Sequence, residues 1–313
     1  MPTSNPEKPS LWPRRRLLGL GVGLGLLGIG AAAGIVELVQ VGALPGGQVL
    51  DEVTGACSLA APAYGNISVG PLISGHFFSR MRNREVGYTI AYPPGRQPFD
   101  HLPLVLVLHG YGDDHLSAFS DLNLQHALAY LVTKEKRLPF ALVAADGGNG
   151  YWHSAPGDNP QGMLVSELLP LCGRVGLGRH GALASYGWSM GGYGALLLGE
   201  QHRGLLRGIG VASPAIWANY HQAQAANSQA FQSSAQFHAD DVVTNASKLA
   251  DLPVLVRCGA SDPFLPGAQL LKHSLLAGDT NASVKISKGC HDAAFWESTS
   301  VEILGFLASS LAT

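Results

Sequence analysis

Residues 187–191 read Gly-Trp-Ser-Met-Gly, a spacing that can place a nucleophilic serine on a sharp turn. The pattern G-x-S-x-G is typical of a turn between a strand and a helix, where a strained backbone exposes the serine hydroxyl. Gly187 and Gly191 lack the Cβ atoms that would clash where the flanking chain approaches the turn. The first turn of the following helix would favour a developing negative charge. The spacing therefore predicts that Ser189 is a catalytic nucleophile.

A serine hydroxyl becomes a good nucleophile only beside a general base, and the base needs an orienting carboxylate. On folds that carry this turn, the chain order is serine, acid, histidine. Asp262 follows the apolar run 254–258, and His291 follows the run 284–286. An aspartate in front of a proline, as Asp262 is, also often caps a turn. The remaining acids considered follow no such run: Asp240, Asp241, Asp251 and Asp279. Chain order and strand-end placement together predict a triad of Ser189, Asp262 and His291.

Acyl transfer also needs two N–H donors for the negative charge that develops on the carbonyl oxygen. One is expected from the backbone of Met190, the residue after the nucleophile. The other is expected from residues 109–112, His-Gly-Tyr-Gly, which follow an apolar run. We assign it to the backbone of Tyr111, with Gly112 as the alternative.

A metal site is the alternative role for the histidines of this same loop. His109 and His115 flank two aspartates, but no matching cluster of ligands occurs elsewhere in the chain. Loop capping and packing explain these residues more simply. We therefore expect neither a metal nor a cofactor.

The residues singled out above must be positioned by alternating strands and helices. Apolar runs bounded by Gly, Pro or Asp predict strands at 74–78, 85–92, 102–108, 140–145, 182–186, 206–211, 254–258 and 283–286. Helical spacing falls at 121–133, 162–175, 191–198, 267–277 and 297–311. This alternation predicts an α/β fold with a mostly parallel, doubly wound sheet. Residues 220–250 are polar and interrupt the alternation of strands and helices, which predicts an inserted cap or lid of polar helices. The alternative is an ordinary surface crossover between the two flanking strands.

Composition excludes one function class and limits the cysteine chemistry. The chain has 313 residues, a net charge of −2 and only 13% charged residues, against about 25% in average proteins. Three of its 20 lysines and arginines lie together at 14–16, so no basic surface for nucleic acid is left. Cys57, Cys172, Cys258 and Cys290 form no C-x-x-C pair, which argues against a zinc ribbon or a redox motif. Two disulfides and four buried thiols both remain open.

The first 43 residues have the pattern of an export segment. Residues 14–16 are three arginines, and residues 17–36 carry no charge but include seven glycines. An arginine pair before a mild, Gly-rich apolar run predicts a twin-arginine signal, with small residues at 41–43 for cleavage. The alternative is an uncleaved anchor that crosses the membrane with residues 17–36. Both place the domain 44–313 outside the cytoplasm, secreted or attached to the cell envelope.

Several segments together resemble a known family: HGYGDD, DGGNGYW, GWSMGGYGALL, GASDPF and GCHDAAFW. They are similar to an esterase family of α/β-hydrolases that includes S-formylglutathione hydrolases, feruloyl and siderophore esterases and actinobacterial mycolyltransferases. The resemblance covers residues 70–310 and implies the α/β-hydrolase fold, no cofactor and the triad named above. It also implies that the loop 146–159 borders the substrate pocket. Tyr151 and Trp152 of this loop are expected to contact substrate, with core packing as the alternative for Trp152. Trp188, the residue before Ser189, is also expected to contact substrate.

These observations predict an exported serine carboxylesterase that hydrolyses small-molecule or lipid acyl esters. One alternative is an acyltransferase that passes the acyl group from Ser189 to a sugar or lipid hydroxyl. The other is a non-catalytic envelope binding protein that retains the fold. Product analysis separates the first two, and an active-site phosphonate probe separates the third.

Overall fold

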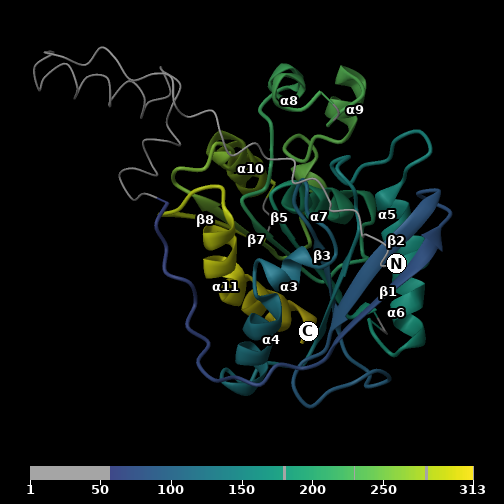
Figure 1. Cartoon of the computed structure of the whole chain (residues 1–313). Helices are drawn as coiled ribbons and strands as arrows, with labels where there is room; N and C mark the ends of the chain where they lie inside the picture. Colours follow the sequence, from purple (N-terminus) through teal and green to yellow (C-terminus); the bar gives the residue numbers. More distant parts are fainter. Residues whose placement is uncertain (1–56, 179–180, 229, 279–280, 313) are drawn as a thin grey trace, which may run out of the picture. The chain divides into compact units, whose positions relative to one another are not determined.

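The computed structural model describes residues 57–178, 181–228, 230–278 and 281–312, and its centre is an eight-stranded sheet (Figure 1). The strand order is β1-β2-β4-β3-β5-β6-β7-β8. β2 pairs antiparallel with β1 and β4, and all the other neighbours are parallel. The strands are β1 Leu72–Ser79, β2 Arg84–Ala91, β3 Leu104–Leu108, β4 Ala141–Ala145, β5 Leu183–Trp188, β6 Ile209–Ala212, β7 Val254–Gly259 and β8 Ala282–Ser287. The predicted mostly parallel sheet is confirmed.

Helices cover both faces of this sheet. α4 and α11 pack on one face, and α5, α6, α7 and α10 contribute to the apolar cluster on the other (Figure 1). The helices are α3 Ser117–Ser120, α4 Leu124–Thr133, α5 Pro160–Met163, α6 Leu169–Arg174, α7 Met190–Gln201, α8 Tyr220–Ala226, α9 Ser234–Ala239, α10 Leu265–Ala277 and α11 Ala293–Leu311, with a π-helix at Leu164–Leu168 and a 3-10 helix at Ala246–Leu249. β3, β4 and β5 are buried throughout, as strands covered on two faces must be.

Within the described ranges, no helix is long and apolar enough to cross a membrane. The predicted export segment 1–43, with its apolar run 17–36, lies outside the described residues.

The polar segment 220–250 forms short helices between β6 and β7. α8 and α9 lie together beyond one end of the sheet (Figure 1). The Tyr193 hydroxyl of α7 donates to the carbonyl of Asp240 at 2.7 Å, and the Gln236 amide donates to the carbonyl of Ser154 at 3.0 Å. The segment is thus fastened to the first helix after the predicted nucleophile and to the loop 146–159. Its role as a cap stays a prediction.

A single disulfide joins Cys57 to Cys290, and Cys172 and Cys258 are buried free thiols. The sequence left open either two disulfides or four buried thiols, and the structure has one disulfide and two buried thiols. Cys57 and Cys290 are 233 residues apart in the chain, so only the fold could reveal the pair.

A buried carboxyl on α7, that of Glu200, should make the protein less stable as the pH rises. Glu200 is 4% exposed, and neither of its side-chain oxygens has a hydrogen-bond partner among the described residues. Burial is the main cause that raises the pKa of Glu200 from its ordinary 4.5 to about 8. The positive charge of Lys248 lowers this pKa, and the negative charges of Asp241 and Asp240 raise it further. Because the pKa of Glu200 is higher in the folded state than in the unfolded chain, the protonated carboxyl favours folding. This contribution to stability is complete below pH 4.5 and is lost as the pH rises toward 8.

Replacing Glu200→Gln should remove this pH dependence. In the window between pH 4.5 and 8, unfolding of the wild type is favoured by about 1.4 kcal/mol more for each pH unit, because unfolding lets the carboxyl ionise. The Gln variant should therefore match the wild type near pH 4.5 and be more stable at pH 8. Urea unfolding at several pH values measures the difference. Parallel stability curves for the two proteins would show that Glu200 already ionises freely in the folded state.

Candidate active site

Ser189 lies on the turn between β5 and α7, in the strained conformation that the sequence predicts. Its φ is +52° and its ψ is −122°, a left-handed backbone that most side chains avoid. A Cβ at Gly187 would lie 2.1 Å from the carbonyl oxygen of Gly191, and a Cβ at Gly191 would lie 1.9 Å from that of Leu108. Both glycines are therefore required for the chain to make this turn.

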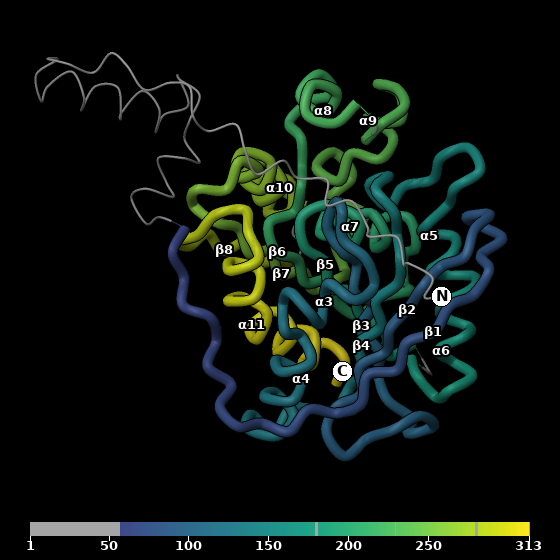
Figure 2. Tube along the Cα trace, viewed as in Figure 1, coloured from purple at the N-terminus to yellow at the C-terminus, as the bar shows by residue number. Residues whose placement is uncertain are grey.

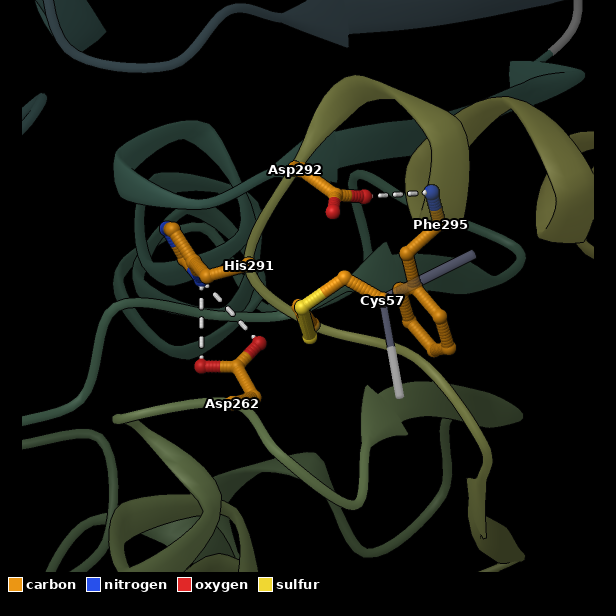
Figure 3. Close-up of a disulfide and its surroundings, with 6 residues drawn as sticks. Cys57, Asp262, His291, Asp292 and Phe295 are labelled. Atoms are coloured by element: carbon orange, nitrogen blue, oxygen red, sulfur yellow. Dashed lines mark hydrogen bonds and ion pairs between the residues drawn. A yellow bond between two sulfur atoms is a disulfide. The ribbon is translucent and has the colours of Figure 1, made fainter. Parts of the chain in front are cut away.

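The three residues predicted as a triad are linked by hydrogen bonds. Ser189 Oγ lies 2.8 Å from His291 Nε2. His291 Nδ1 lies 3.1 Å from Asp262 Oδ1 and 3.0 Å from Oδ2 (Figure 3). Ser189 follows β5, Asp262 follows β7 and His291 follows β8, so three strands deliver the three side chains to one edge of the sheet.

The surroundings of Asp262 keep its carboxylate charged. Asp262 is 4% exposed, and burial by itself raises the pKa of a carboxyl. His291, through its hydrogen bond and its charge, acts together with Ser213 and with the Phe264 N–H, which donates to Oδ1 at 2.8 Å. Their sum outweighs burial, so the net pKa of Asp262 is lowered. A buried carboxylate at this position holds the Nδ1 proton and stabilises a positively charged imidazole.

The two backbone N–H groups predicted as oxyanion donors belong to Met190 and Tyr111. Among the described residues, the N–H groups of Met190 and Tyr111 have no hydrogen-bond partner. The Gly112 N–H, which was the alternative donor, instead donates to Asn149 Oδ1 at 2.8 Å. This geometry favours Tyr111 over Gly112 as the partner of Met190 in an oxyanion hole.

The aromatic residues predicted to contact substrate are buried. Trp152 is 0% exposed and Trp188 is 1% exposed, so both side chains pack in the core, and their contact with substrate stays a prediction. Their indole N–H groups donate to the His109 carbonyl at 3.2 Å and to Asp113 Oδ2 at 2.9 Å. Both indoles therefore hold the loop that carries Tyr111, which is the packing role left open for Trp152. Tyr151 is also buried, at 4% exposure.

The sequence analysis missed Phe264, which packs against the triad histidine, and Trp217, which packs against Phe264. The Phe264 ring is centred 4.9 Å from the His291 ring and 4.6 Å from the Trp217 ring. The Trp217 indole donates to the Tyr151 hydroxyl at 3.2 Å. Phe264 directly follows Pro263 after β7, and Trp217 lies three residues after Pro214 beyond the end of β6, but neither position by itself indicates contact with His291.

A cavity of about 470 Å³ opens beside these two rings, against α8 and the start of α10. Most of its wall is apolar, and it is lined by Ile216, Trp217, Ala218, Gln222, Ala225, Ala226, Pro263, Phe264, Pro266 and Gly267. The small residues of α8 leave this space open. Apolar or aromatic groups are the chemistry that such a wall accepts.

The histidines weighed as metal ligands are engaged in hydrogen bonds. His109 Nε2 accepts from the Gly147 N–H at 2.8 Å, and its Nδ1 lies 2.7 Å from the Gly110 carbonyl. Burial lowers the pKa of His109, which keeps the ring neutral in this role. His115 Nδ1 lies 2.8 Å from Thr89 Oγ1. Both rings thus serve the structure of the loop.

Comparison with known proteins relates most of the chain to one family. The family described as "Putative esterase" matches residues 79–307. Similar solved structures include a ferulic acid esterase (18% identity, TM-score 0.70, covering 78% of this chain and 100% of that one). An S-formylglutathione hydrolase from Agrobacterium tumefaciens is also similar (16% identity, TM-score 0.64, covering 79% of this chain and 98% of that one). So is MPT51 from Mycobacterium tuberculosis (20% identity, TM-score 0.61, covering 76% of this chain and 99% of that one). No curated protein matches the chain.

Proposed function

The chain belongs to this esterase family and has the α/β-hydrolase fold, and on that premise we propose that it is an exported serine carboxylesterase whose nucleophile is Ser189. Family membership makes it a serine ester hydrolase; the triad, the acyl-enzyme and the export are the proposal. The observation that supports it most is the continuous hydrogen-bond path from Ser189 through His291 to a charged Asp262.

The reaction proceeds in two steps. His291 Nε2 accepts the Ser189 proton while Oγ attacks the ester carbonyl carbon, and the N–H groups of Met190 and Tyr111 stabilise the oxyanion. The same Nε2 then donates its proton to the departing alcohol, which leaves an acyl-enzyme. Water, deprotonated by His291, attacks this ester and releases the acid and the free serine. Asp262 stays ionised throughout and balances the imidazolium charge.

The cavity beside Phe264 and Trp217 supports an ester with an apolar or aromatic group. Its wall is lined mainly by alanine, proline and aromatic side chains, and Phe264 contacts the ring of the proposed base. A substrate group in this cavity would contact Phe264, whose ring also packs against the ring of His291.

Ester hydrolysis with product analysis tests the proposed function. The purified protein is given aryl and alkyl esters, with and without an excess of glycerol or trehalose. Free acid as the main product in both conditions supports hydrolysis. Acylated glycerol or trehalose as the main product would assign an acyltransferase, and no turnover of any ester would contradict both.

Export is proposed from the arginine cluster and the uncharged, Gly-rich run after it. The Cys57–Cys290 disulfide supports this part of the proposal, because disulfides persist in oxidising compartments. Changing Arg14→Lys and Arg15→Lys should block export of the protein, measured by cell fractionation against the wild type. Normal export of this variant would show that the twin-arginine route is wrong. A mature N-terminus near Leu44 would exclude a permanent anchor.

A further inference from the structure

The disulfide lies directly beside the proposed base. Cys290 immediately precedes His291 in the chain, and its bond to Cys57 holds the two Cα atoms 5.0 Å apart (Figure 3). Cys290 is 7% exposed. The bond therefore fastens the backbone of the histidine loop to a segment that comes from the far end of the described chain.

That segment, residues 57–71, runs along the outside of the domain as an extended strap (Figure 2). The Tyr64 ring lies 6.0 Å from the His126 ring and 6.2 Å from the Tyr130 ring of α4, and its hydroxyl is 3.4 Å from Ser300 Oγ of α11. Near β1, the carbonyl of Gly70 accepts a hydrogen bond from Gln125 at 2.6 Å. The strap is thus held by packing along its length and by a covalent bond at residue 57.

Besides the contacts of the His291 ring itself, two hydrogen bonds hold the loop on either side of this residue. On one side, the Gly289 carbonyl accepts from the Ser261 N–H at 3.0 Å. Gly289 has a φ of +141°, and a Cβ there would lie 2.2 Å from the Phe295 ring, so the loop follows a narrow path. On the other side, Asp292 caps α11 by accepting from the Phe295 N–H at 2.8 Å (Figure 3). The disulfide is a covalent attachment at Cys290, the residue directly before His291.

We propose that the Cys57–Cys290 disulfide is a positioning element for His291, so that the oxidised protein is the catalytically competent form. The proposal rests on the proposed function, because it assigns the disulfide a role in proton transfer by His291. The imidazole must meet Ser189 Oγ at 2.8 Å and Asp262 at 3.0 Å at the same time. A displacement of about 1 Å in such a site can cost about 100-fold in rate.

Reduction reverses the positioning by ordinary thiol–disulfide exchange. A dithiol reductant supplies two electrons and two protons, the bond between the two Sγ atoms breaks, and both cysteines become thiols while the reductant closes to its own cyclic disulfide. The loop then keeps its attachments at Gly289 and Asp292 but loses the covalent one. Catalysis should weaken while the sheet and the other two triad residues stay in place.

The test separates positioning from a general effect on stability. The variant Cys57→Ala/Cys290→Ala is compared with the wild type, with Cys172→Ala as a buried free-thiol control and with Tyr64→Ala, which loosens the strap but keeps the disulfide. Circular dichroism and thermal melting define a temperature at which all four proteins are folded. At that temperature, kcat, KM and the rate of fluorophosphonate labelling are measured. EDTA is present because the ligand atoms of Cys57, Cys290 and Asp292 lie within 4.8 Å of one another and the freed thiols could bind a metal ion.

We expect the double variant to lose about 10- to 100-fold in kcat and in labelling rate, with little change in KM. Wild type treated with dithiothreitol should show the same loss and recover on reoxidation, whereas both control variants should keep wild-type kcat. Wild-type kcat in the folded double variant would overturn the proposal. An equal loss in Tyr64→Ala would overturn it too, because the strap and not the disulfide would then be responsible. An inactive oxidised wild type would instead contradict the proposed function.

Discussion

Replacing Ser189→Ala should lower kcat by about four to six orders of magnitude, because the variant has no oxygen with which to form the acyl-enzyme. Residual turnover would come only from binding and the oxyanion donors. The strained turn should persist, because Ser189 already carries a Cβ at a φ of +52° and alanine adds no atom. Hydrolysis of an aryl acetate measures the effect, and thermal melting checks the fold.

A neighbouring serine provides the matched control for this substitution. Ser185 lies on the same strand, β5, is buried, and its hydroxyl has no hydrogen-bond partner among the described residues. Ser185→Ala therefore removes a buried hydroxyl at no cost to the proposed chemistry and should keep kcat near that of the wild type. Substantial turnover by Ser189→Ala would exclude Ser189 as the nucleophile.

Replacing Asp262→Asn should lower kcat by about 10⁴-fold while the loop geometry is kept. The carboxylate accepts from His291 Nδ1 and so leaves Nε2 free to take the Ser189 proton. An amide can donate its own N–H to Nδ1 instead, which stabilises the wrong tautomer and removes the charge that balances the imidazolium. Steady-state kinetics over a range of pH measures the loss.

The control for Asp262→Asn is Asp241→Asn. Asp241 accepts from Val243 N–H at 2.9 Å and from the Thr244 hydroxyl at 2.6 Å in the polar segment, outside the triad. Its substitution should leave kcat close to the wild-type value. If Asp262→Asn were as active as this control, another group would have to orient His291.

The fold was largely predictable because its signals are local. Each central strand is an apolar run closed by Gly, Pro or Asp, and each predicted strand overlaps an observed one. The helix predicted at 162–175 is instead α5, a π-helix and α6 in succession. Pro170 lies in the first turn of α6 and has no backbone N–H to donate. The hydrogen-bond pattern of the helix changes from π to α just before this proline.

The features that could not be predicted depend on three-dimensional placement. Trp152 and Trp188 belong to the segments that resemble the family, but only the fold shows that their indoles point into the core. The pairing of Cys57 with Cys290 depends on where a strap of irregular structure ends. Phe264 belongs to the candidate site because its ring packs against His291, and the positions of these two residues in the sequence do not reveal this contact.

The central claim is that Ser189 is a nucleophile activated by His291, and covalent labelling tests it most directly. A fluorophosphonate probe reacts with an activated serine, and intact-protein mass spectrometry followed by peptide mapping counts and locates the adducts. We predict one adduct on the wild type, located at Ser189, and no adduct on Ser189→Ala. An unlabelled wild type, or an adduct on a different residue, would contradict the account.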